Sequence, residues 1–172
     1  NLAKNKKHLT GTNPSVGCVI VKQNRVVTFG STNINGRPHA ETIALNRNKN
    51  NNNGSTLYVS LEPCSHYGKT PPCTKAIVKS KIKKVIYSIE DNDFRSHKKS
   101  KKILRSKKIS VQSGLLSKET RKLYKTYNYV KKNNKPYIIG KLACSSNLSI
   151  LKNKTHITNE YSRKVSHLLR YE

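Results

Sequence analysis

The chain has 172 residues, 35 basic against 8 acidic side chains, and a formal net charge of +27. This length allows one domain with a buried core. The longest apolar runs, 16–21 and 57–61, are far shorter than the roughly 20 residues of a membrane helix, so we expect no transmembrane segment and no membrane partner. The chain begins at Asn1 without a leader pattern, and we therefore expect a fragment that shows no signal peptide.

The four cysteines and the basic excess restrict the compartment and the partners. Cysteines without a leader indicate a reduced, cytoplasmic protein that uses some thiols as ligands, rather than a disulfide scaffold. A basic excess ordinarily indicates nucleic acid as a partner. Here it is mostly lysine, spread over every segment and accompanied by asparagine runs such as 50–53, which is typical of compositional bias. We therefore do not expect nucleic acid, although the positive field would attract a phosphorylated small-molecule substrate.

Apolar runs of period two and segments with helical spacing alternate along the chain. Residues 2–9 have the pattern of a helix end, closed by Gly11. The next elements in chain order are expected to be strands at 16–22 and 25–29, a helix from Pro38 to Leu45, a strand at 56–61, a helix at 74–80, a strand at 84–89, a helix at 96–106, a strand at 109–112 and a helix at 118–129. This order predicts an α/β fold in which helices cover both faces of a mixed sheet.

The predicted elements divide the chain into a main domain and a tail. Residues 1–130 are expected to form the main domain, and the polar segment 131–135 a linker. Residues 136–143 have the pattern of a new strand, and a further helix is expected at 160–170. The tail 136–172 is too short to build a second nucleotide-binding domain, so we interpret it as a truncated start of one.

Three residues with metal-binding side chains stand at predicted element boundaries. His39 lies near a helix start, Cys64 follows a strand and Cys73 begins the next helix. One imidazole and two thiolates are ligands that zinc prefers, and they leave a fourth position open, as in catalytic sites. The helix dipole should help Cys73, and also Cys64, to ionise. Each residue alone is more often a surface histidine or a small core cysteine, but their occurrence together in this order of elements indicates a zinc site.

Glu41 is the predicted catalytic residue. It lies two residues after His39, about 200° around a regular helix, so it cannot bind the metal from the same face. In the first turn it can instead lean over a water molecule at the open zinc position. Zinc lowers the pKa of such a water, and a neighbouring carboxylate can take its proton and deliver it to a substrate.

Other polar and thiol side chains have less specific patterns. Cys18 and Cys144 fall in predicted strands and are expected to be buried thiols without a function. Glu62, before Pro63, is expected to anchor a loop by hydrogen bonding rather than to take part in catalysis. His66 lies between the two metal-binding cysteines, where it could contact a substrate or structure the loop, and both alternatives stay open.

Three segments carry a family resemblance: 13–18 (Asn-Pro-Ser-Val-Gly-Cys), 39–41 (His-Ala-Glu) and 62–73. They resemble the deaminase part of bifunctional riboflavin-biosynthesis proteins, which belong to the cytidine-deaminase-like superfamily. The specific feature is the loop 65–72, because most cytidine and tRNA-adenosine deaminases have two residues between their zinc cysteines and this chain has eight. The resemblance implies a three-layer α/β/α fold, a homo-oligomer, and hydrolytic removal of an amino group from a phosphoribosylamino-substituted diaminopyrimidinone, which gives the aminouracil and ammonia.

The resemblance also implies residues that contact the substrate. Asn13 matches an asparagine that faces the pyrimidine, and Lys69 matches a basic loop residue suited to the phosphate. The backbone around Ala40 is expected to position the ring. Asn13 could equally be a turn residue before a proline, and Lys69 one more solvated lysine.

The chain also departs from the family pattern. Asp91 matches a substrate-side residue, but Asp93 replaces an amide with a charge, which leaves its role open. Residues 136–143 resemble the opening strand of the family's reductase domain. Residues 146–148 (Ser-Asn-Leu) stand where the family has Leu-Asp-Gly, so we predict no reductase activity.

Two other functions are compatible with parts of this pattern. The charge would favour a deaminase of tRNA or of another nucleobase, and the eight-residue loop between the cysteines opposes it. A non-catalytic zinc or nucleic-acid-binding module would leave Glu41 idle.

Overall fold

The computed structural model describes residues 1–150 and 157–170. The chain divides into two compact units, Asn1–Lys135 and Pro136–Glu172. The first unit contains the sheet and all the predicted site residues. None of the helices in the described residues has both the length and the apolar character that crossing a bilayer requires.

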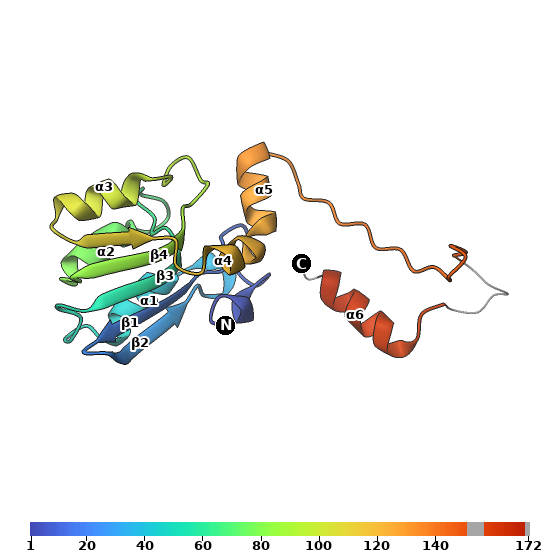
Figure 1. Cartoon of the computed structure of the whole chain (residues 1–172), viewed down its shortest axis with the longest axis horizontal. Coiled ribbons are helices and arrows are strands. Elements are labelled where there is room, and N and C mark those ends of the chain that lie inside the picture. The colour runs from blue at the N-terminus through green and yellow to red at the C-terminus, as the bar shows by residue number, and fades with distance from the viewer. Residues whose placement is uncertain (151–156, 171–172) are drawn as a thin grey trace. The chain divides into compact units, whose positions relative to one another are not determined.

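A five-stranded mixed sheet forms the centre of the first unit, as the sequence predicts. Its strands are β1 (Gly17–Lys22), β2 (Arg25–Ser31), β3 (Thr56–Leu61), β4 (Lys84–Ile89) and β5 (Ser110–Ser113). They lie in the order β2-β1-β3-β4-β5 (Figure 1). Strand β1 is antiparallel to β2 and β3, whereas β3, β4 and β5 run parallel. The carboxyl ends of the three parallel strands therefore meet at one edge of the sheet, where the first metal-binding cysteine follows β3.

The turn between β1 and β2 is a two-residue hairpin. Gln23 and Asn24 have positive φ values of 49° and 58°, the combination that a type I′ turn requires. The right-handed twist of such a turn matches that of the two strands it joins, so β1 and β2 pair from Lys22 and Arg25 onward.

Short helices surround the sheet. They are η1 (Lys4–Lys6), η2 (Ile34–Gly36), α1 (Ala40–Arg47), α2 (Cys73–Lys79), α3 (Lys99–Ser106), α4 (Ser117–Leu123) and α5 (Lys125–Asn133). The second unit contains α6 (Glu160–Arg170). Helix α1 packs on β1, β2 and α2, and α2 packs on α3. Helix α4 packs on β4 from the other face, the face turned towards the viewer in Figure 1. The predicted α/β/α layers are thus confirmed.

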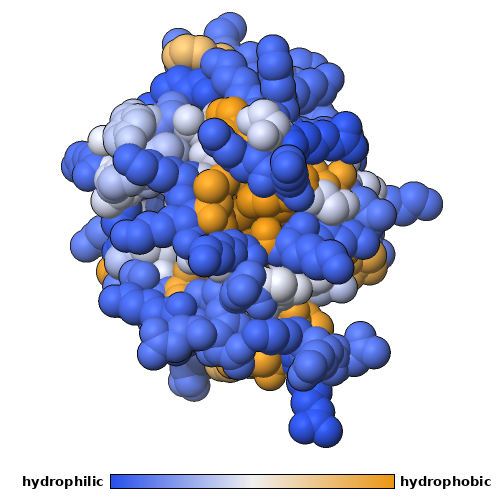
Figure 2. Space-filling view, turned by 90° about the vertical axis from the view of Figure 1, so that its left-hand side faces the viewer, coloured by the Kyte–Doolittle hydropathy of each residue, from blue (hydrophilic) through white to orange (hydrophobic). Residues whose placement is uncertain are grey.

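The core lies between the sheet and helices α1 to α3. Alternate residues of β3 point into it, and Leu57, Val59 and Leu61 are all buried. Val85 and Tyr87 of β4 continue this layer. The face that Figure 2 shows is mainly hydrophilic, with a smaller apolar area at its centre.

Three expectations about local structure were wrong. Residues 136–143 form no strand, because no neighbouring strand satisfies their backbone in the described residues, and Cys144 is accordingly half-buried rather than buried in a strand. The expected helix at 118–129 is two helices that meet at Tyr124. Residues 2–9 contain only one 3₁₀ turn, η1.

The junction between α4 and α5 has a physical reason. The side chain of Tyr124 is buried, and its hydroxyl donates to the carbonyl of Ser15 at 2.8 Å and lies 2.7 Å from the hydroxyl of Ser60. The change of direction at this residue lets the ring enter the core. Helix α5 then continues to Asn133, so the expected linker 131–135 begins as its last turn.

Candidate active site

Three chain segments bring the predicted metal-binding residues to one edge of the sheet. His39 has extended backbone angles and immediately precedes α1. Cys64 lies in the loop after β3, and Cys73 is the first residue of α2, directly after Pro72. Proline suits this boundary because its fixed φ is compatible with a helix start and it has no N–H to leave unpaired.

The donor atoms of these residues have the spacing of a zinc site. Nδ1 of His39 lies 3.3 Å from Sγ of Cys73 and 3.6 Å from Sγ of Cys64, and the three donor atoms lie within 4.8 Å of one another. In tetrahedral zinc coordination, nitrogen and sulfur ligands are about 3.6 Å apart. The imidazole and the two thiols therefore fit a zinc ion.

The two thiols differ in acidity. The backbone N–H of Cys73 donates to Sγ of Cys64 at 3.2 Å. The hydrogen bond from the Cys73 thiol, together with His39, lowers the pKa of Cys64 to about 4, although burial opposes this. The pKa of Cys73 is raised, because its thiol donates that hydrogen bond and because it is buried. Cys64 is therefore the thiol that ionises easily. At Cys73 the hydrogen bond to Cys64 and burial outweigh the lowering of the pKa that was expected from the helix start.

Glu41 is buried beside this cluster. Its side chain is in the first turn of α1, and the residue is 4 % exposed. Burial, and then the neighbouring Cys64, raises the pKa of Glu41 to about 7, with His39 opposing the shift. A carboxyl group with a pKa near neutrality can both accept and donate a proton.

A small cavity joins Glu41 to the metal-binding cluster. It has a volume of about 40 Å³ and is lined by His39, Glu41, Cys64 and Asp91, among others. This volume accommodates water. A larger cavity, of about 570 Å³, lies between α4 and the other face of the sheet and is lined by none of the metal-binding residues. The chemistry therefore belongs to the small cavity.

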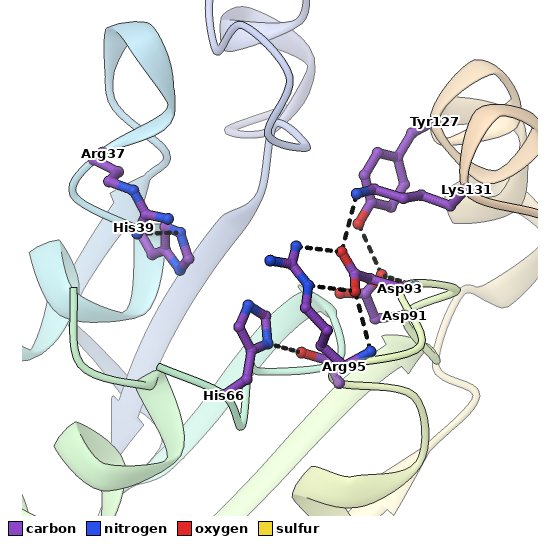
Figure 3. A network of polar contacts seen from close by, with 9 residues as sticks. Arg37, His39, His66, Asp91, Asp93, Arg95, Tyr127 and Lys131 are labelled. Carbon is purple, nitrogen blue, oxygen red and sulfur yellow. Dashed lines mark hydrogen bonds and ion pairs between the residues drawn. The ribbon is translucent and has the colours of Figure 1, made fainter. Parts of the chain in front are cut away.

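Asp91 and Asp93, after β4, lie across from His39 (Figure 3). The hydroxyl of Tyr127 donates to Oδ1 of Asp91 at 2.8 Å. The carboxylate of Asp93 accepts hydrogen bonds from the guanidinium of Arg95, at 2.8 and 2.6 Å, from its backbone N–H at 3.1 Å, and from Lys131 at 2.9 Å. Arg95, and then Lys131, holds the pKa of Asp93 well below its usual range. The charge that departs from the family pattern is thus neutralised within the chain.

Glu62 is a structural anchor, in agreement with the sequence. Its carboxylate accepts hydrogen bonds from the backbone N–H groups of Asp91, Lys98 and Ser100, at 3.0 to 3.2 Å, and from the hydroxyl of Ser100 at 2.8 Å. These bonds tie the end of β3 to the loop that leads into α3.

The remaining predicted residues have different surroundings. The amide of Asn13 donates to the carbonyl of Gly36 at 3.2 Å, and a Cβ at Gly36 would come within 2.7 Å of Cβ of Asn13, so the two segments need a glycine there. Ala40 is fully buried. Nδ1 of His66 lies 2.9 Å from the hydroxyl of Ser96, which connects the loop 65–72 to the loop after β4. Lys69 is exposed.

The sequence interpretation missed Tyr127, Lys131, Arg95 and Arg37. The two tyrosines Tyr124 and Tyr127 are spaced as one face of a helix, which is the signal that could have drawn attention to them. Nothing in the sequence connects that face to Asp91, because 36 residues separate Tyr127 from it.

The family model of the cytidine and deoxycytidylate deaminase zinc-binding region matches residues 1–89. The chain belongs to this deaminase family. The zinc cofactor that the sequence predicts is therefore confirmed, because the matched region is a zinc-binding one and contains His39, Cys64 and Cys73.

Relatives and solved structures define the branch of the family. A diaminohydroxyphosphoribosylamino-pyrimidine deaminase of Buchnera aphidicola (from Schizaphis graminum) is 46% identical over 126 residues, which cover 73% of this chain and 86% of that protein. The riboflavin biosynthesis protein RibD of Aquifex aeolicus is 41% identical over 176 residues, with 100% of this chain and 49% of the relative covered. The structure of Acinetobacter baumannii RibD, form 2, has a TM-score of 0.93 at 35% identity and covers 99% of this chain and 48% of that one. The chain thus spans about half the length of the RibD proteins, and the resemblance to the riboflavin-biosynthesis deaminases is confirmed.

Proposed function

We infer that the chain is a zinc-dependent deaminase of riboflavin biosynthesis that converts a phosphoribosylamino-substituted diaminopyrimidinone to the corresponding aminouracil and ammonia. The observation that carries this proposal is the buried carboxyl of Glu41 beside the cluster of His39, Cys64 and Cys73. The Buchnera relative, of which the alignment covers 86%, bears the name of this activity.

The proposed reaction exchanges an amino group for the oxygen of water. His39, Cys64 and Cys73 would hold the zinc, and the bound ion would supply the Lewis acidity that makes a water molecule nucleophilic near neutral pH. Glu41 takes a proton from the water and passes it to the ring nitrogen. The C–O bond forms, the hydroxyl on the ring carbon gives its remaining proton through Glu41 to the amino group, and the C–N bond breaks as ammonia leaves. Glu41 can take both roles because its pKa of about 7 lies near neutrality.

Binding of the substrate involves both walls of the site in this proposal. Asn13 and the backbone at Ala40 position the pyrimidine ring, and Asp91 faces it from the loop after β4. His66 and Lys69 lie in the loop 65–72, where Lys69 meets the phosphate. The hydrogen bond of His66 to Ser96 supports a role in shaping this loop.

The proposal extends to the compartment, the assembly and the tail. Four free cysteines fit a reduced cytoplasmic environment. A homo-oligomer is expected from the family resemblance, and light scattering of the purified chain tests it. The main domain ends near residue 130, and the tail 136–172 is similar to the start of a reductase-like domain.

The decisive experiment is an ammonia-release assay with the zinc-loaded chain. We expect ammonia from the phosphoribosylated diaminopyrimidinone and none from a tRNA anticodon stem-loop. Deamination of the RNA alone would make the chain a nucleic-acid deaminase. Turnover of neither substrate would leave a zinc-binding module as the function.

A further inference from the structure

Arg37 is a cation at the rim of the site that the mechanism above does not use. Its Nη1 donates to the hydroxyl of Thr70 at 2.6 Å and lies 3.3 Å from Nε2 of His39 (Figure 3). The guanidinium forms no ion pair with a carboxylate in the described part of the chain. A half-buried arginine of this kind has hydrogen-bonding capacity to offer a ligand.

The contact between Arg37 and His39 cannot be a hydrogen bond when the metal is bound. Nδ1 of His39 faces the two sulfur atoms, so the metal takes that nitrogen and the ring proton stays on Nε2. Arginine has only donors. An N–H group of Arg37 and the N–H group of His39 therefore lie side by side, with Nη1 and Nε2 3.3 Å apart. A third group that accepts hydrogen bonds from both is needed to satisfy them.

The surroundings of Arg37 leave room for that acceptor. The guanidinium lies against the loop 65–72, where a Cβ added at Gly68 would come 3.3 Å from Nη2 of Arg37. The absence of a side chain at this position keeps that edge of the guanidinium uncrowded. Thr70 holds the group by one nitrogen, and Lys69 is exposed between these two loop residues.

We propose that Arg37 binds the phosphate group of the substrate, with a phosphate oxygen accepting hydrogen bonds from Arg37 and from Nε2–H of His39. The planar guanidinium matches the geometry of phosphate oxygens, and a charge-assisted bond of this type is stronger than one between neutral groups. Arg37 is thus a specificity-determining residue that favours phosphorylated over dephosphorylated substrate. This inference rests on the proposed function for the identity of the substrate but not for the binding of phosphate.

The test compares Arg37→Gln with Arg25→Gln as a matched control. Arg25 is an exposed arginine at the start of β2, and the pairing of Val21 with Thr56 places it at the opposite end of the sheet from the site. Calorimetric titration of the zinc-loaded proteins with inorganic phosphate should show affinity weakened about 10- to 100-fold in Arg37→Gln and nearly unchanged in Arg25→Gln. Zinc content should be the same in both.

Kinetics supply a second readout. KM for the phosphorylated substrate should rise by about the same factor in Arg37→Gln, whereas the substrate without its phosphate should show a much smaller change. Arg37→Lys should recover only part of the loss, because lysine lacks the planar fork. Equal phosphate affinity in the two glutamine variants, or loss of zinc from Arg37→Gln, would overturn the proposal. If phosphate binding depends on Arg37 but the pyrimidine is not deaminated, the proposed function fails and the anion site stands.

Discussion

Tyr127, on the last helix of the first unit, donates a 2.8 Å hydrogen bond to the carboxylate of Asp91 on the wall of the active-site cavity. Burial raises the pKa of Tyr127, so its hydroxyl stays protonated and acts as the donor at physiological pH. Burial also raises the pKa of Asp91. A residue outside the family motifs thus positions one that the resemblance assigns to the substrate.

Replacing Tyr127 by phenylalanine should weaken both stability and catalysis. The loss of one hydrogen-bond donor to a buried carboxyl should lower the free energy of unfolding by about 1 to 3 kcal/mol. The activity should fall because Asp91 is less well oriented, while zinc content stays the same. Urea unfolding and ammonia release measure the two effects. Tyr58→Phe is the control, because no hydrogen bond of that hydroxyl occurs among the described residues. Equal losses in both variants would mean that the hydrogen bond to Asp91 has no specific role.

Substitutions of Glu41 and of Cys73 should distinguish the loss of proton transfer from the loss of metal binding. Glu41→Gln keeps the shape of the side chain and removes the proton acceptor, so it should retain zinc and lose at least about 100-fold in kcat. Cys73→Ser should lose zinc, and activity with it, because the ligand set falls below three strong donors. Metal analysis of the purified variants, combined with ammonia release, checks both. Substantial ammonia release by Glu41→Gln would contradict the mechanism.

Asp93 should make the free energy of unfolding of the first unit depend on pH in the acid range. Arg95 and Lys131 lower the pKa of this carboxyl, so the folded state favours its ionised form. The stabilisation is present above the unfolded pKa of about 3.9 and is lost as the pH falls from there towards the lower folded value.

Asp93→Asn should therefore destabilise the protein by about 1 kcal/mol at neutral pH, and by less near pH 2. Unfolding by urea at both pH values, relative to the unmutated chain, measures the difference. Glu119→Gln, at an exposed carboxylate without an ion pair in the described residues, should show no such pH dependence. A constant difference at all pH values would show that the ion pairs with Arg95 and Lys131 do not stabilise the fold.

A chain shortened to residues 1–135 should keep zinc and deaminate the substrate. All hydrogen bonds described above for the site fall within this unit, including that from Lys131 to Asp93. Shortening the chain to residues 1–123 removes Tyr124, Tyr127 and Lys131 and should lose both stability and activity. Loss of zinc from the 1–135 chain would show that the tail supports the site.

Some local elements were predictable to the residue. The strands 56–61 and 84–89 were expected where β3 and β4 lie, because each is a short β-branched and apolar run bounded by polar residues. The strand expected at 136–143 had a similar pattern and does not form. A strand is stable only when its backbone groups find a partner, and the local pattern contains no information about that partner.

The chemistry proposed for the site could be predicted from the amino-acid sequence. His39, Glu41, Cys64 and Cys73 are recognisable because their side-chain types and the boundaries of their elements are local properties. The tertiary structure alone decided which distant groups surround that chemistry. Tyr127 meets Asp91 across 36 residues, and Arg37 meets Thr70 across 33. Such contacts depend on how the helices and loops pack around the sheet, and no periodicity in the chain encodes them.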